Sequence, residues 1–111
     1  MKTLNEITDN LKSAVGRYET LPLDDVKELS EILRILDVNL SYLVFVRDEY
    51  YRSFQSVYFN SKAKSEAGKQ KEAEMRIPEL DLVRKVLRHF ADVQGSIRSQ
   101  ISLRKKNDER N

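Results

Sequence analysis

The longest stretch without a helix-breaking residue constrains the fold of this chain more than any other feature. Between residues 23 and 67 there is neither a glycine nor a proline, so the backbone there offers no obstacle to a helix. Apolar side chains recur in this stretch at alternating spacings of three and four, interrupted at Arg47, and they are Leu29, Leu33, Leu36, Leu40, Leu43, Tyr50, Phe54 and Val57. This spacing puts them on one side of an α-helix. Because about 40 helical residues form a rod of about 60 Å, we expect the chain itself, other subunits, or both to pack along it.

Two further helices are predicted around this rod. An apolar stripe over residues 4–17 predicts a short first helix, which Gly16 weakens and Pro22 ends. The long helix itself is expected over residues 25–65, with an aspartate directly before it as its N-cap.

The remaining residues predict a return along the rod. The polar segment 60–75 has Gly68 at its centre and is the expected place for the chain to reverse direction. A third helix is expected over residues 71–105, and because its apolar stripe crosses Pro78 in phase, we favour one kinked helix over two separate helices. The polar tail, residues 106–111, is expected to fray.

Composition favours a single all-α domain over residues 1–111. Charged residues make up 34% of the chain, whereas it has three glycines and two prolines, a balance that favours long solvated helices over sheets with many turns. The expected fold is a short N-terminal helix packed on a long antiparallel helical hairpin. Cysteine is absent, which removes disulfides and thiolate chemistry. No apolar run has the length of a signal peptide or a membrane span, so a cytoplasmic location without membrane contact is expected.

Aromatic residues are concentrated in the second half of the rod. Seven of the nine lie between residues 42 and 59. Four of them share an arc with Leu43 and Val57 and are most simply core, namely Tyr50, Tyr51, Phe54 and Tyr58. Phe45 and Phe59 point close to the opposite side. Together with Tyr51 and Tyr58, these two rings are candidates for an oligomer contact or for base stacking, and the wide aromatic arc predicts a homo-oligomer.

Charge is distributed unevenly along the chain. Residues 1–59 carry a net charge of −3 and residues 60–111 a net charge of +5. The basic half indicates either ordinary solvated helix surfaces or a polyanionic partner. Candidate phosphate-binding residues are Lys62, Lys64, Lys69 and Lys71 in the reversal, and Arg84, Lys85, Arg88, Arg98, Arg104, Lys105 and Lys106 on the third helix.

The sequence argues against an enzyme and predicts no cofactor. His89 is the single histidine, and its neighbours Arg88 and Phe90 provide no partner for base or nucleophile chemistry. The three glycines are isolated, so there is no glycine-rich phosphate loop, and no metal-ligand spacing is present.

Two binding hypotheses remain. In the first, the basic third helix and the lysine-rich reversal bind single-stranded nucleic acid, with lysines and arginines on phosphates and exposed rings on bases. In the second, the protein is a helical interaction module, for example an inhibitor or assembly factor, that binds another protein and no nucleic acid.

Two segments resemble a known phage family. The sequence AKSEAGKQKEAEMR at residues 63–76, with its order of small, Lys, Gly, Lys, acidic and Arg residues, and SIRSQISLRK at residues 96–105 are similar to the UvsY-type recombination mediators of T-even phages. The resemblance covers residues 40–105 and is one of pattern. This chain is shorter than the best-known members of that family.

The resemblance implies a small oligomeric protein of an infected bacterial cell. Such a protein binds single-stranded DNA and helps to load a RecA-like recombinase onto strands coated by a single-strand-binding protein. The basic-aromatic segment of the family falls on Tyr58, Phe59, Lys62 and Lys64, or, in an alternative alignment, on Arg47, Tyr50, Tyr51 and Arg52.

Overall fold

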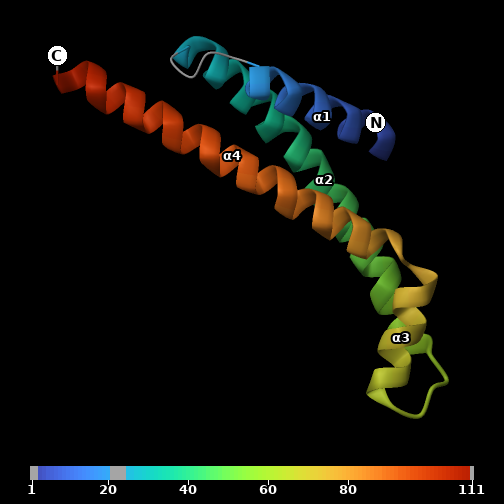
Figure 1. Ribbon diagram of the computed structural model, residues 1–111. Helices are drawn as coiled ribbons and strands as arrows, with labels where there is room; N and C mark the ends of the chain where they lie inside the picture. Colours follow the sequence, from blue (N-terminus) through green and yellow to red (C-terminus); the bar gives the residue numbers. More distant parts are fainter. Residues whose placement is uncertain (1–2, 21–24, 111) are drawn as a thin grey trace.

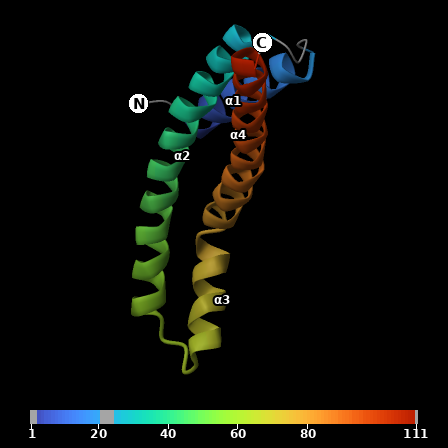
Figure 2. The ribbon, with the colours of Figure 1, turned by 90° about the vertical axis from the view of Figure 1, so that its left-hand side faces the viewer.

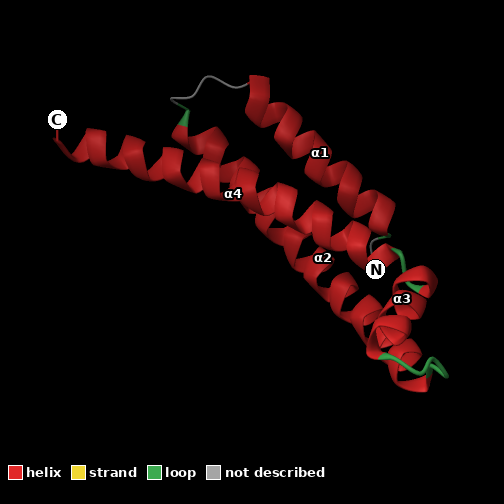
Figure 3. Ribbon diagram, turned by 60° about the horizontal axis from the view of Figure 1, so that its bottom comes forward, coloured by secondary structure: helices red, strands yellow, loops and turns green. Residues whose placement is uncertain are grey.

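The protein is built entirely from helices in the residues that the structure describes. The computed structural model describes residues 3–20 and 25–110, with side chains through residue 106. Its helices are α1 (Leu4–Thr20), α2 (Val26–Asn60), α3 (Glu66–Arg76) and α4 (Glu79–Arg110). Figure 1 and Figure 3 show how these helices are arranged. The all-α prediction is confirmed.

The helices form a hairpin, and α1 packs along one end of it. Figure 2 shows α2 as one arm and α3 followed by α4 as the returning arm. The first helix, α1, packs along the first half of α2 and runs antiparallel to it, as the contacts Asn10–Asn39 and Arg17–Glu28 require. The molecule measures 66 × 27 × 19 Å along its principal axes. The hairpin therefore has a thick three-helix end and a thin two-helix end.

The core lies where the expected apolar stripes meet. Leu29, Leu36 and Leu43 of α2 are 0% exposed. From the other helices, α1 contributes Ile7, Leu11 and Ala14, and α4 contributes Leu80, Val83, Phe90, Ile97 and Ile101. Tyr50, Phe54 and Val57 are half-buried, because α1 does not extend along that part of α2. The stripe prediction is thus confirmed, with a core that thins toward the far end.

Polar side chains fix the alignment of the helices within this core. Asn39 is 3% exposed; its Nδ2 donates to the Ile35 carbonyl at 2.8 Å, and its Oδ1 accepts from Asn10 at 3.2 Å. Gln94, the polar position in the apolar stripe of α4, donates to the Asp37 carboxylate of α2. Such buried contacts are satisfied in one register and lost on sliding, so they specify how the helices align.

The chain reverses earlier than the sequence predicts. Helix α2 ends at Asn60 and α3 begins at Glu66, so the reversal occupies residues 61–65, and Gly68 lies inside α3. The reason is an N-cap: the Ser65 hydroxyl accepts the Gly68 backbone N–H at 3.0 Å and starts the helix there. The predicted end of the long helix at residue 65 was therefore too late, and the predicted start of the third helix at residue 71 was too late as well.

The returning arm is divided at Pro78. The sequence favoured one kinked helix, but the structure has two helices, with Ile77 at φ −123° and ψ 63° between them. The residue before a proline is disfavoured in the α-helical region, which explains the break. Two other boundaries also differ: α1 continues past Gly16 to Thr20, and α4 continues through the tail to Arg110.

We predict that the buried side of α2 carries most of the stability of the fold. Leu36→Ala removes a side chain that is 0% exposed and should lower the free energy of unfolding by about 2–5 kcal/mol. The matched control, Leu82→Ala, changes a side chain that is 55% exposed and should cost about 0.5 kcal/mol or less. Urea unfolding at one protein concentration, followed by circular dichroism, measures both. An equal loss of unfolding free energy in the two variants would contradict the assignment of Leu36 to the core.

Candidate functional site

The candidate basic residues lie in three groups along the molecule. The tip lysines are Lys62, Lys64, Lys69 and Lys71, the mid-helix group is Arg84, Lys85 and Arg88, and the C-terminal group is Arg98, Arg104, Lys105 and Lys106. Twenty residues of α4 separate Arg84 from Arg104, a distance of about 30 Å. Figure 1 shows the end of α4 far from α3. The structure thus does not join these residues into one patch.

The tip is an ordered turn with its own hydrogen bonds. The Ser61 backbone N–H donates to the Tyr58 carbonyl at 3.3 Å, and the Ser61 hydroxyl donates to the Glu72 carboxylate and accepts the Ala63 N–H. These contacts close residues 61–65 against α3. The lysines that follow are therefore presented on a defined backbone. The sequence contains the signal for this turn, a serine directly before Glu66 in the first turn of a helix, which our sequence analysis missed.

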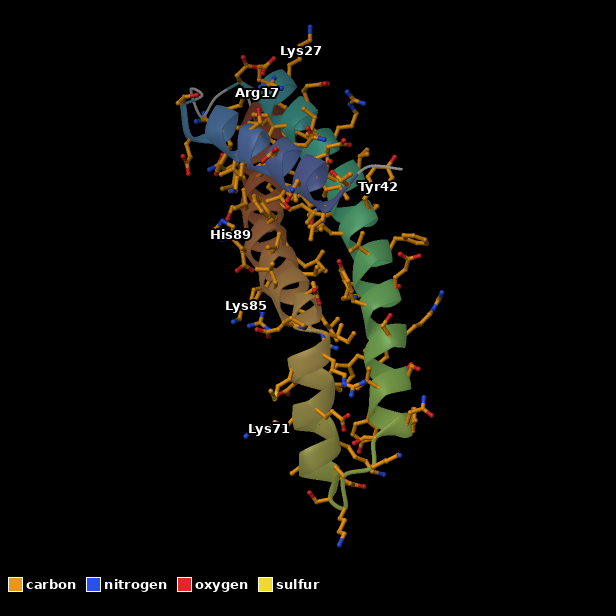
Figure 4. The ribbon with its side chains drawn as sticks, turned by 90° about the vertical axis from the view of Figure 1, so that its right-hand side faces the viewer. Arg17, Lys27, Tyr42, Lys71, Lys85 and His89 are labelled. Carbon is orange, nitrogen blue, oxygen red and sulfur yellow. The ribbon has the colours of Figure 1, made fainter. Side chains whose placement is uncertain are left out.

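The tip lysines form no ion pair with the acidic side chains that the structure describes. Lys62, Lys64 and Lys71 are exposed and Lys69 is half-buried, and none of the four has a described carboxylate within salt-bridge distance. The nearby Glu72 pairs with Arg76 at 3.4 Å instead. Figure 4 shows Lys71 pointing away from α2 into solvent. The tip therefore presents positive charge that an anion can approach without displacing an existing ion pair.

An exposed aromatic ring lies beside these lysines. Phe59, at the end of α2, is 74% exposed, and its ring meets Tyr58 edge to face with centroids 5.5 Å apart. Tyr58 is half-buried. Leaving a phenylalanine this exposed costs burial free energy, unless a partner covers it. Of the predicted stacking residues, Phe59 and Tyr58 thus lie in the last turn of α2, directly before the reversal that carries Lys62 and Lys64.

The other two predicted rings lie elsewhere on α2. Tyr51 is 43% exposed, so its assignment to the core was wrong, and the Arg84 guanidinium lies over its ring at 5.8 Å. This cation–π contact covers part of the Tyr51 ring, and it already engages the positive charge of Arg84. Phe45 is 47% exposed near the middle of α2, about 20 Å along the helix from Phe59.

Two cations of the remaining groups already have partners. Lys85 pairs with Asp81 at 2.9 Å, and Arg98 pairs with Asp37 at 3.2 Å. These pairs are exposed and therefore weak, but they reduce the net positive charge of the α4 surface. Among the described side chains, the candidate cations without a printed ion pair are thus the four tip lysines together with Arg84, Arg88, Arg104, Lys105 and Lys106.

The hollows of the surface are shallow and carry no recognisable reaction chemistry. A cleft of about 350 Å³ lies where α2, α3 and α4 meet, lined by Phe54, Ile77, Pro78 and Arg84 among others. His89 lines a second hollow, between α1 and α4, and its ring contacts the Phe90 ring with the centroids 5.0 Å apart.

Within residues 3–20 and 25–106, no three histidine, aspartate or glutamate side chains are arranged to hold a metal ion. None of the described helices is long and apolar enough to cross a bilayer.

Comparisons with protein-family models, with curated proteins and with solved structures find no match for this chain. The resemblance to the UvsY-type mediators therefore stays a prediction from the sequence pattern.

We predict that the Ser65 cap holds the tip in shape. Ser65→Ala removes the acceptor of the Gly68 N–H and should destabilise the first turn of α3 by about 1 kcal/mol. Amide hydrogen exchange should become faster at Gly68 and Lys69, while the core amide of Ile97 keeps its protection. Ser53→Ala is the control, because the Ser53 hydroxyl contacts only the Glu49 carbonyl within α2. Unchanged exchange at Gly68 would show that the cap is not needed.

Proposed function

We propose that this protein is a non-catalytic single-stranded DNA-binding protein that uses the tip of its helical hairpin. The observation that carries the proposal is the tip itself, where four lysines without described ion-pair partners follow the exposed Phe59 at the end of α2. Lysine ammonium groups bind phosphates, and an aromatic ring stacks on a base that is not paired with another strand. The two contacts together favour a single strand, because a duplex buries the faces of its bases.

The position of the tip supports the same proposal. Most acidic residues of the first half of the sequence belong to α1 and the start of α2, at the opposite end of the molecule (Figure 2). Repulsion between those carboxylates and a nucleic-acid backbone is screened over about 10 Å at 0.1 M salt. The tip lies well beyond this distance from them, as the 66 Å length of the molecule indicates. A strand bound at the tip therefore avoids the acidic end.

The narrower role in phage recombination rests on the resemblance. The basic-aromatic segment of the UvsY-type family falls on Tyr58, Phe59, Lys62 and Lys64, which all belong to the tip or adjoin it. The alternative alignment uses Arg47, which pairs with Asp48 at 3.2 Å, and Tyr50, which is half-buried. The geometry thus favours the first alignment. In this proposal the protein helps to load a RecA-like recombinase onto single strands coated by a single-strand-binding protein.

A protein-interaction module without nucleic-acid binding is the second candidate. It is favoured by the exposed apolar side chains Val38, Tyr42 and Phe45 in the middle part of α2, away from the tip. Salt dependence separates the two candidates, because phosphate contacts weaken steeply as salt rises.

We predict that reversing charge at the tip removes DNA binding. Lys62→Glu with Lys64→Glu should weaken binding to a fluorescent single-stranded oligonucleotide at least about tenfold at about 50 mM salt, and should lower the salt slope by about 1.4. The control pair, Lys12→Glu with Lys27→Glu, makes the same change in net charge at the acidic end and should have a much smaller effect. Fluorescence anisotropy over a salt series measures all three proteins.

Two outcomes would contradict this prediction. If the unaltered protein shows no salt-sensitive binding at about 50 mM salt, the proposed function is wrong. If the tip variant binds normally while Arg84→Glu, Lys85→Glu and Arg88→Glu together abolish binding with helicity intact, the site lies on α4 instead.

We predict a separate contribution from Phe59. Phe59→Ala should weaken binding to single strands by about 1–3 kcal/mol, because it removes a stacking surface, and should leave the salt slope unchanged. Met75→Ala is the matched control, since Met75 is also 74% exposed and lies on α3. Competition with unlabelled oligonucleotides measures the affinities. Equal losses in the two variants would show that general apolar contact, and not stacking, is responsible.

A further inference from the structure

The outer side of α2 carries an apolar patch of partly exposed side chains. Val38, Tyr42 and Phe45 are 44%, 39% and 47% exposed. At 100° per residue they fall within an arc of about 60°, directly opposite the buried Leu29 and Leu40. Figure 4 shows Tyr42 projecting from α2 on the side away from α4. We call these three side chains the outer patch.

Charged residues flank the outer patch in a symmetrical order. Arg34 precedes Val38 by four residues, and Glu49 follows Phe45 by four. The next positions on the same side of the helix, Glu31 and Arg52, lie seven residues from the patch at each end. Read from the N-terminal end of α2, the signs are therefore negative, positive, patch, negative, positive.

We infer that a second copy of this chain packs on the outer patch with its α2 antiparallel. A twofold axis near residues 41 and 42 places Val38 against Phe45 of the second copy and brings Tyr42 beside its own symmetry mate. The same axis places Arg34 against Glu49 of the second copy and Glu31 against Arg52 of the second copy.

Charge complementarity selects this arrangement. A parallel pair in register would set Glu31 against Glu31 and Arg34 against Arg34, whereas the antiparallel pair sets every one of these charges against its opposite. Glu49 and Arg52 have no ion-pair partner among the described side chains. Their pairing across the interface therefore breaks no existing contact.

The Glu31–Arg34 contact within α2 keeps both of these groups charged. The Arg34 guanidinium donates to the Glu31 carboxylate at 2.7 Å, and this hydrogen bond with its positive charge lowers the pKa of Glu31. The same contact raises the pKa of Arg34. The pair is exposed, so a charge from a second copy can join it at little cost.

The dimer also fixes where the two tips lie. From the proposed axis to residue 62 is a helical distance of about 30 Å, so the tips would lie at opposite ends, about 60 Å apart. The outer patch lies in the middle part of α2, whereas the tip lysines follow the end of α2. The dimer thus stands independently of DNA binding, and its test needs no nucleic acid.

Cysteine cross-linking tests the antiparallel register. The chain has no cysteine, so a single introduced thiol reports one position. Ser41→Cys lies beside the axis and should form a disulfide-linked dimer under mild oxidation. Ser56→Cys is the control on the same side of the helix; its two copies would lie about 40 Å apart in the antiparallel dimer but together in a parallel one. Cross-linking at position 56, whether or not position 41 also cross-links, would overturn the register.

Charge reversal tests the complementarity. Glu49→Arg should weaken the dimer about tenfold by sedimentation velocity, and Arg34→Glu in the same chain should restore it, because the two positions face each other. Phe45→Glu should give a monomer of normal helicity, since this side chain is 47% exposed and not part of the core. A native protein that stays monomeric over the whole concentration range, or a double variant as weak as Glu49→Arg, would overturn the inference.

Discussion

The burial of one side of α2 is the interaction on which the rest of the structure depends. Leu29, Ile32, Leu36 and Leu43 are fully buried because α1 and α4 meet α2 from two directions. Where α1 is absent, along the second half of α2, the same apolar stripe continues but is only half-buried. Apolar burial is the main favourable term in folding, so the three-helix end anchors the protein and the two-helix end is an extension of it. The tip can therefore present Phe59 and lysines to solvent without weakening the core.

Apolar packing alone would let these long helices slide, and polar contacts prevent it. Asp37 of α2 accepts hydrogen bonds from both Gln94 and Arg98 of α4, and Gln100 of α4 donates to the Tyr18 hydroxyl of α1 at 2.7 Å. Each contact links two helices at one position along their length. Because shifting a helix by one turn would leave these groups unsatisfied, the polar contacts determine which part of α3 lies beside the end of α2. The composition of the tip thus depends on contacts made near the other end.

The sequence predicted the helices and the core well, but located the candidate site poorly. Periodicity reports directly on which side of a helix is buried, and Leu36 or Val83 could be assigned from spacing alone. The end of α2 depends instead on a local competition, in which the Ser65 cap starts a helix before Gly68 can act as the turn. Which cations lie close together depends on the length of the helices. Lys62 and Arg104 both belong to the basic half of the sequence, but they lie near opposite ends of the molecule. Tyr51 was wrongly assigned to the core because the side of α2 on which it lies is buried only where α1 also covers the helix.

The two surfaces proposed for α2 differ in how they respond to solution conditions. Lysine–phosphate contacts at the tip weaken with salt through counterion release, whereas an interface centred on Val38, Tyr42 and Phe45 is mainly apolar and retains most of its strength. A dimer with tips about 60 Å apart adds a second effect. A strand that is bound at one tip and is long enough to reach the other tip meets it at a high effective concentration, whereas a shorter strand cannot reach it. For a short strand, each tip acts alone and dimerisation leaves affinity unchanged. For a long strand, affinity depends on both surfaces, so the length of the strand separates self-association from the chemistry of the tip.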